Sequence, residues 1–179
     1  DPAFADKLDL AVDEKANPES ARLGRILLYY REHLDEAERQ TMGWLSAFPR
    51  GLSMELLGVL SNADGELAGV LVHCGDARLL AVLERLRSLG LVFGYGAGGA
   101  LRWSAHPFLR DHFKVLLGVP AERAHDVVRE ELAKGLERRP GTPTEDPTVL
   151  DRYEAWIEHA RGAGKAQEAF ELFNFALGG

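Results

Sequence analysis

The sequence predicts a mainly helical protein that carries a single two-stranded β hairpin. Apolar side chains recur at every third or fourth position in residues 77–89, as Leu79, Leu83 and Leu86, which is the period of a helix. Residues 101–105 instead alternate apolar and polar side chains, which is the period of a strand. A glycine-rich stretch separates this strand from the apolar run 91–93. We therefore expect a hairpin whose tip contains the glycines.

Composition indicates a globular protein with a real core. The chain has 179 residues, of which 46% are hydrophobic, and a net charge of -7. Neither half of the chain is basic, so we do not expect it to bind nucleic acid. The only cysteine, Cys74, excludes an intrachain disulfide and fits a reducing compartment. No apolar run is long enough to span a bilayer, so we expect a cytoplasmic protein with no membrane partner.

Helix signals follow one another through the first half of the chain. Residues 1–20 have few periodic apolar positions and are expected to be a lead-in or linker. A first helix follows, and Asp35 with Glu38 then resembles a capping box for a second one that buries Trp44. Pro49 and Gly51 end that helix, and Ser53 is expected to cap a third. Residues 61–76 have no clear pattern.

The second half continues with helices after the hairpin. Pro107 is placed as the first residue of a helix with Phe113 on its inner face, and 118–120 is expected to be a joint. A charged helix is predicted over 121–138, a loop over 140–147, and two helices over 148–162 and 165–177. Helices followed by a two-stranded wing form a winged helix, a relative of the helix-turn-helix. We therefore expect a lead-in (1–20), a winged-helix domain (21–118) and a helical region (119–179).

The glycines also match a dinucleotide-binding pattern, G-x-G-x-x-G, at Gly94, Gly96 and Gly99. Such a loop needs a helix immediately after it, because the free N–H groups of the helix hold the pyrophosphate. A strand follows here instead. No G-x-x-x-x-G-K-[ST] occurs either, so the chain has no Walker A motif and we expect no cofactor within it.

The last helix pair resembles a tetratricopeptide repeat (TPR). Its sequence is YEAWIEHARGAGKAQEAFELFNFAL, and the small and aromatic positions of such a repeat fall on Gly164, Ala169, Phe173 and Ala176. The small residues are expected to let two helices approach closely. Because one repeat cannot bury its own face, further repeats or the preceding helix should cover it. Tyr153 and Trp156 are either part of a binding groove or part of the core.

Residues 22–117 resemble the winged-helix region of bacterial STAND ATPases, the signal-transducing family that includes NB-ARC and NACHT proteins. The resemblance rests on three segments in the same order, RILLYYREHLDEAERQTMGWLSAFPRGLSMELL, LLAVLERLRSLGLV and RWSAHPFLRDHF. It implies a winged helix that folds on a nucleotide-binding domain of the same polypeptide, with ATP or ADP and magnesium held there. It also implies helical repeats that sense a ligand or protein partner, and oligomerisation on activation. The chain itself would then be a non-catalytic regulatory fragment.

The resemblance implies a nucleotide-sensing role for His106, which stands where the family has the histidine of a Met-His-Asp motif. Ala105 and Pro107 replace the methionine and the aspartate. An imidazole can donate a hydrogen bond to a phosphate oxygen and so distinguish bound nucleotides. The alternative is that His106 caps the helix that Pro107 begins, and both roles are compatible.

Neither catalysis nor metal binding is indicated by the residue pattern. The histidines and the cysteine lack zinc-ligand spacing, and no serine stands in a G-x-S-x-G motif. DNA binding by a free-standing winged-helix regulator is the alternative function. Arg78 and Arg85 lie seven residues apart on the helix before the wing, and Arg102 lies in the wing. The alternative for these arginines is a solvated helix face.

Overall fold

The computed structural model describes residues 27–30, 32–96, 101–137 and 145–176. The chain forms two units, residues 1–35 and 36–179. In the first unit, residues 27–30 and 32–33 are helical, within the first helix that periodicity predicts. The predicted lead-in at 1–20 lies outside the described residues.

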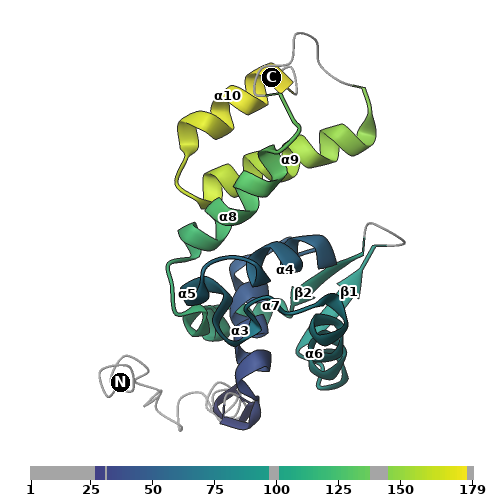
Figure 1. The fold of residues 1–179 in the computed structure, drawn as a ribbon, viewed down its shortest axis with the longest axis vertical. Helices are drawn as coiled ribbons and strands as arrows, with labels where there is room; N and C mark the ends of the chain where they lie inside the picture. The colour runs from purple at the N-terminus through teal and green to yellow at the C-terminus, as the bar shows by residue number, and fades with distance from the viewer. Residues whose placement is uncertain (1–26, 31, 97–100, 138–144, 177–179) are drawn as a thin grey trace, which may run out of the picture. The chain divides into compact units, whose positions relative to one another are not determined.

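The second unit is mainly helical and carries one small sheet, as the sequence predicts (Figure 1). We call residues 36–117 the hairpin lobe and the described residues of 121–176 the helical lobe. The elements of the hairpin lobe are, in order, α3 (Glu36–Ala47), α4 (Met54–Ser61), α5 (Gly65–Ala68), η1 (Gly69–Leu71), α6 (Asp76–Ser88), β1 (Val92–Tyr95), β2 (Arg102–Ala105), α7 (Pro107–Lys114) and η3 (Val115–Leu117).

Helix α3 forms the centre of the hairpin lobe because it is buried along most of its length. Trp44 is fully buried, and its indole Nε1 donates to the carbonyl of Leu67, 3.0 Å away. On another face, a Cβ placed on Gly43 would lie 2.9 Å from the backbone nitrogen of Leu117. Only glycine therefore lets η3 approach α3 this closely.

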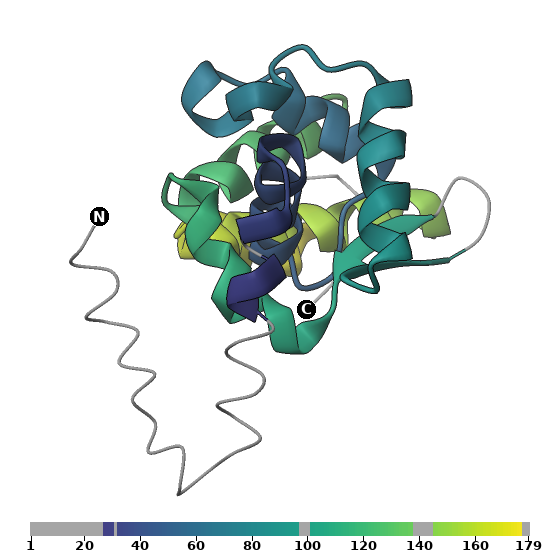
Figure 2. The same cartoon turned by 90° about the horizontal axis from the view of Figure 1, so that it is seen from below.

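The hairpin is antiparallel and is extended at one edge by a single residue of the chain before α4. Val92 pairs with Ala105 and Tyr95 with Arg102, which confirms the predicted hairpin. The backbone of Leu52 exchanges two hydrogen bonds with that of Trp103, at 2.8 and 2.9 Å. This bridge ties the turn after α3 to β2. Figure 2 shows α6 lying beside the hairpin, and the two elements are in contact.

The glycines of the G-x-G-x-x-G stretch serve the hairpin. Gly94 lies inside β1, opposite Trp103, and so is not at the tip where the sequence placed it. Gly96 follows β1 with a φ of +90°, a conformation that glycine adopts without strain. Gly99 lies outside the described residues. The chain continues into β2, and α7 begins only after it.

Caps fix the short helices between α3 and β1. Ser53 is the N-cap of α4 and its side chain accepts from the backbone N–H of Leu56, as predicted. Asp64 caps α5 by accepting from the N–H groups of Glu66 and Leu67. This cap gives helical turns to residues 65–71, where periodicity gave no prediction.

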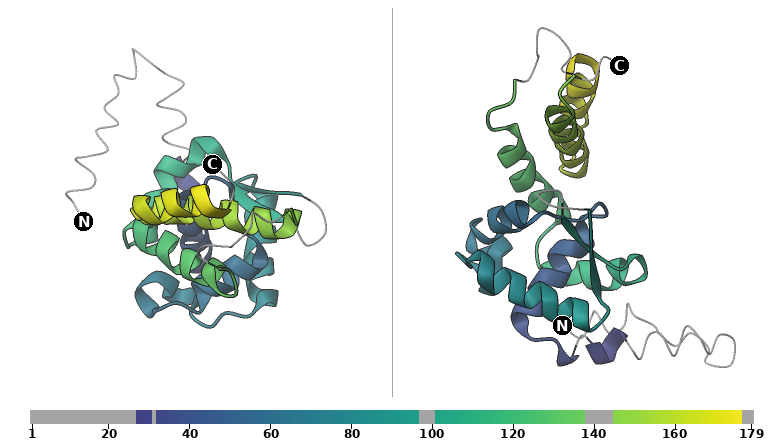
Figure 3. Two further views of the ribbon diagram at one scale, coloured as in Figure 1. Left: turned by 90° about the horizontal axis from the view of Figure 1, so that it is seen from above. Right: turned by 90° about the vertical axis from the view of Figure 1, so that its right-hand side faces the viewer.

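The helical lobe contains α8 (Ala121–Ala133), α9 (Pro147–Gly162) and α10 (Ala166–Ala176). Both α8 and α10 pack on α9, and Figure 3 shows α10 lying along it. Helix α8 ends five residues before the predicted position, because Gly135 takes a φ of +75°. Asp146 caps α9 through the N–H of Thr148. Of the predicted loop at 140–147, residues 140–144 lie outside the described residues.

The two lobes belong to one unit and contact each other. Helix α8, which follows the predicted boundary at 118/119, packs on α3 and α4. Gly118 has a φ of +74° and turns the chain from η3 toward α8.

Candidate functional site

His106 lies at an exposed corner between β2 and α7. Its backbone N–H donates to the carbonyl of Leu91 and its own carbonyl accepts from the N–H of Leu109. It occupies the N-cap position of α7, but its side chain makes no capping hydrogen bond. The imidazole instead stacks on the ring of Phe108, with centroids 5.5 Å apart and planes at 22°. Capping therefore does not explain this side chain.

Phe108, the second residue of α7, lies at the same corner, and its side chain is 78% exposed. A large aromatic side chain in water contributes nothing to the core of this lobe. The pair of His106 and Phe108 presents an imidazole nitrogen and an apolar ring at the same place. Such a corner is suited to contact with another surface that includes a hydrogen-bond acceptor.

The structure places the three predicted arginine contacts in different surroundings. Arg78 is exposed on the first turns of α6. Arg85 lies 3.6 Å from the carboxylate of Glu38 on α3. Arg102 instead lines a hollow of about 410 Å³ together with residues of α9, among them Glu158. Arg102 thus faces the helical lobe rather than joining an arginine face on α6.

Tyr153 and Trp156 belong to the core of the helical lobe, together with Leu172. Trp156 is fully buried and Tyr153 is 2% exposed, and their rings stack with centroids 6.1 Å apart. The Tyr153 hydroxyl donates to the carbonyl of Glu137, 2.8 Å away. These contacts favour the core alternative for both aromatics over the groove alternative.

The remaining TPR-like positions have separate roles. Ala169 is 4% exposed and is buried on the inner face of α10, whereas Phe173 is 48% exposed. Gly164 has a φ of +74°, and nothing lies within 4 Å of a Cβ placed on it. The turn after α9 therefore requires this glycine, and close helix packing does not. Ala176 is the last residue of α10, and its side chain lies outside the described residues.

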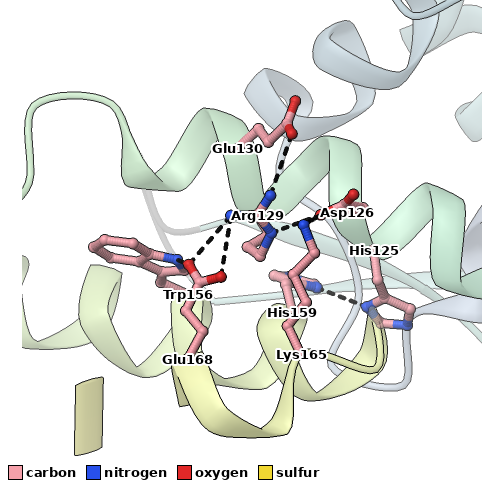
Figure 4. A network of polar contacts seen from close by, with 8 residues as sticks. All are labelled: His125, Asp126, Arg129, Glu130, Trp156, His159, Lys165 and Glu168. Atoms are coloured by element: carbon pink, nitrogen blue, oxygen red, sulfur yellow. Dashed lines mark hydrogen bonds and ion pairs between the residues drawn. The ribbon is translucent and has the colours of Figure 1, made fainter. Parts of the chain in front are cut away.

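A polar network that the sequence did not predict joins α8 to α10 (Figure 4). Arg129 is 5% exposed and donates to Asp126 at 2.6 Å and to Glu168 at 3.2 Å. Glu168 also accepts from the Trp156 indole nitrogen at 3.0 Å, and Lys165 lies 2.7 Å from Asp126. Burial raises the pKa of Asp126, but hydrogen bonds from Lys165 and Arg129 outweigh this and hold it below its usual value. Every charge in this network has a partner, so it is a structural element.

Two buried histidines meet where the lobes touch, and the sequence did not predict this pair either. His125 of α8 and His159 of α9 have their Nδ1 atoms 2.9 Å apart, and His125 Nε2 lies 3.2 Å from the carbonyl of Ala47. The ring of Phe48 packs against both imidazoles. A Cβ placed on Gly162 would lie 2.4 Å from His125 Nδ1. Gly162, and not Gly164, is thus the glycine that permits close packing.

Adjoining hollows follow the exposed side of α9. The largest that we describe has a volume of about 760 Å³, and its lining includes Arg50, Glu158 and Phe173. Glu158 lies 3.4 Å from Arg50. Burial raises the pKa of Glu158, although Arg50 and Arg102 oppose this shift. The lining carries both signs of charge, so it favours no simple anion or cation.

Within the described parts of the chain, no group of three or more His, Cys, Asp or Glu side chains is placed to hold a metal ion. No helix of those parts is both long and apolar enough to cross a membrane. Comparison with known protein families, curated proteins and solved structures finds no match to this chain.

Proposed function

We propose that this chain is a non-catalytic regulatory module in which a winged helix restrains a nucleotide-binding domain of the STAND type. The observation that carries the proposal is the exposed corner of His106 and Phe108 at the start of α7. In this proposal the His106 imidazole contacts the phosphates of bound ADP and holds the inactive state. The helical lobe then serves as the TPR-like part that receives a ligand or partner.

The order of elements in the hairpin lobe supports the winged-helix part of the proposal. Helix α3 is followed by the strand-like bridge of Leu52, then by α4 and α6, and then by the antiparallel wing. A winged helix combines three helices with a small sheet in this manner. The bridge also fixes the position of β2, and α7 with His106 begins directly after that strand.

The position of His106 supports its assignment as a phosphate contact. Its backbone is held on both sides by hydrogen bonds, to Leu91 and from Leu109, while the imidazole is exposed. A fixed backbone with an exposed ring is a suitable arrangement for recognising a group on another domain. Phe108, stacked against the imidazole, adds apolar area that such a domain would cover.

The test compares nucleotide retention in the polypeptide in which this chain is joined to its nucleotide-binding domain. We expect His106→Ala to lose most of the co-purifying ADP, measured by chromatography of the released nucleotide, and to raise basal activity. His73→Asn is the matched control. His73 is also an exposed histidine of the hairpin lobe, with a φ of 52° that asparagine tolerates. Equal ADP content in the wild type and both variants would overturn the latch role of His106.

A free-standing DNA-binding regulator is the second candidate, favoured by the exposed Arg78 on α6. Two neighbouring arginines of α6 are already engaged, Arg85 with Glu38 and Arg87 with Glu84 at 2.7 Å. The net charge of -7 also opposes binding to phosphates. Binding of the chain to duplex DNA that weakens steeply with salt would favour this function. No binding at low salt would exclude it.

A further inference from the structure

The contact between the lobes contains two histidines that differ from the exposed His106. His125 is 8% exposed and His159 is 3% exposed. Their positions are 34 residues apart in the chain, on α8 and α9, and both meet the end of α3 at Ala47 and Phe48. The pair is thus enclosed by three helices from both lobes.

The hydrogen bonds determine where the protons of the pair lie. The Ala47 carbonyl can only accept, so His125 Nε2 carries a hydrogen. In a neutral His125 the Nδ1 atom is then an acceptor, and His159 Nδ1 must donate to it across 2.9 Å. These bonds run from His159 through His125 to Ala47, and they allow at most one proton between the two Nδ1 atoms.

Little in the surroundings favours a positive charge on these rings. Ala47, the last residue of α3, contributes its carbonyl, and Phe48 directly after it contributes an aromatic ring. The charged groups that act on the pair are Lys114 at the end of α7, Glu122 on α8 and Arg102 on β2. Two of these three are positive. Glu158, the neighbour of His159 in the chain, is paired with Arg50.

The same surroundings determine the direction of the pKa shifts. Burial lowers the pKa of His125, and Lys114 lowers it further, although the Ala47 bond and Glu122 oppose this. Burial lowers the pKa of His159 to about 3, and His125 and Arg102 act in the same direction. Both rings therefore resist protonation for as long as the lobes stay in contact.

Full protonation of the pair and the close packing of α8 on α9 consequently exclude each other. A first proton can lie between the two Nδ1 atoms, but it leaves an ion beside Phe48 and away from water. A second proton turns both Nδ1 atoms into donors that face each other at 2.9 Å, which breaks the hydrogen bond between α8 and α9. Gly162 packs directly on the His125 ring, so the ring has no space to turn aside.

We propose that His125 and His159 form a pH-sensitive latch, which holds α8 and α9 together against the end of α3 when neutral and loosens this packing when acidification protonates the pair. This inference goes beyond the proposed nucleotide-dependent function and does not rest on it. The latch acts between two parts of the same chain, and it needs neither nucleotide nor partner.

The first test observes the imidazole protons directly in the whole chain. Long-range proton–nitrogen NMR spectra assign tautomers, and the single variants His125→Gln and His159→Asn identify the two signals. At pH 7.5 we expect the Nε2–H tautomer for His125 and the Nδ1–H tautomer for His159. The opposite tautomers, or two rings that are charged at this pH, would overturn the latch. The tautomers are read in the wild-type protein, and the variants serve only to assign its signals.

The second test measures the loosening of α8 from α9 and from the end of α3 by amide hydrogen exchange in α8, corrected for the intrinsic effect of pH. With a pKa of about 3 for His159 in the closed state and about 6.5 in water, the opening constant should rise about thirtyfold from neutral pH to pH 5. The double variant with His125→Gln and His159→Asn should lose this dependence. Glu158→Gln, which removes a nearby carboxylate, is the control and should keep the pH dependence. An equal rise in the double variant, or no rise in the wild type, would contradict the proposal.

Discussion

Replacing Gly162 by alanine tests the packing on which the lobe contact depends. Alanine has a higher helix propensity than glycine, which predicts a gain of about 0.5 to 1 kcal/mol inside a helix. The structure instead predicts that Gly162→Ala lowers the stability of the protein. A Cβ at this position would lie 2.4 Å from Nδ1 and 2.5 Å from Cγ of His125, well inside normal contact distance.

The His125 ring has no low-energy way to move aside. It is held by Ala47 and His159 through its two nitrogens, and Phe48 packs against it. Overpacking of this kind costs about 1 to 3 kcal/mol, and a lost hydrogen bond costs about 1 kcal/mol more. After the propensity gain is subtracted, Gly162→Ala should lower the free energy of unfolding by about 2 kcal/mol.

Urea denaturation of the variant beside Gly58→Ala gives the measurement. Gly58 lies inside α4 with nothing within 4 Å of its Cβ position, so its substitution should stabilise by about 0.5 to 1 kcal/mol. In a His125→Ala background the obstructing ring is absent, and Gly162→Ala should become neutral or slightly stabilising. If Gly162→Ala is as stable as Gly58→Ala in the otherwise wild-type chain, the packing argument for the His125 site is wrong.

Other contacts give predictions that the same denaturation assay checks. Ser53→Ala removes the cap of α4 and should cost about 1 kcal/mol, whereas an unchanged midpoint would show that the cap contributes nothing. Arg129→Met leaves the carboxylate of Glu168 without its buried arginine partner and should lower the free energy of unfolding by about 3 kcal/mol. Arg87→Met, which removes an exposed ion pair, should change it by less than about 0.5 kcal/mol. The folded-state pKa of His159, about 3, lies below its unfolded value. Its stabilising contribution is therefore complete above about pH 6.5 and falls as pH decreases toward 3, with about 2 kcal/mol lost at pH 5; a variant with His159→Asn should lack this component.

Local patterns predicted those elements whose cause is local. The period of Leu79, Leu83 and Leu86 predicted α6, because these side chains share one face that the lobe buries. Ser53 predicted its own cap because the acceptor and the N–H it satisfies are three residues apart. Periodicity failed at 65–71, since a helix of one turn is too short to show a period and depends on the Asp64 cap.

The polar contacts between helices join residues that are far apart in the sequence, so residue spacing along the chain could not predict them. His125 and His159 are ordinary members of two helical patterns until α8 and α9 pack against α3. The same holds for Arg129, whose partner Glu168 is 39 residues further along the chain. Gly162 and Gly164 show most clearly what the sequence could not predict. Gly162 is required because the His125 ring fills the place of a Cβ, and Gly164 is required for its positive φ. The sequence alone does not distinguish these two reasons.

The contacts between the lobes differ in how much each stabilises the packing of one lobe on the other. Arg123 pairs with Asp64 and Glu66 across the contact, but all three side chains are at least 41% exposed. Exposed pairs of this kind contribute about 0 to 1 kcal/mol because water solvates both charges. The histidine pair is buried, so its neutral state contributes hydrogen bonds and apolar contact that water does not replace. The buried histidine pair is therefore the part of this contact whose contribution to stability we expect to depend on pH.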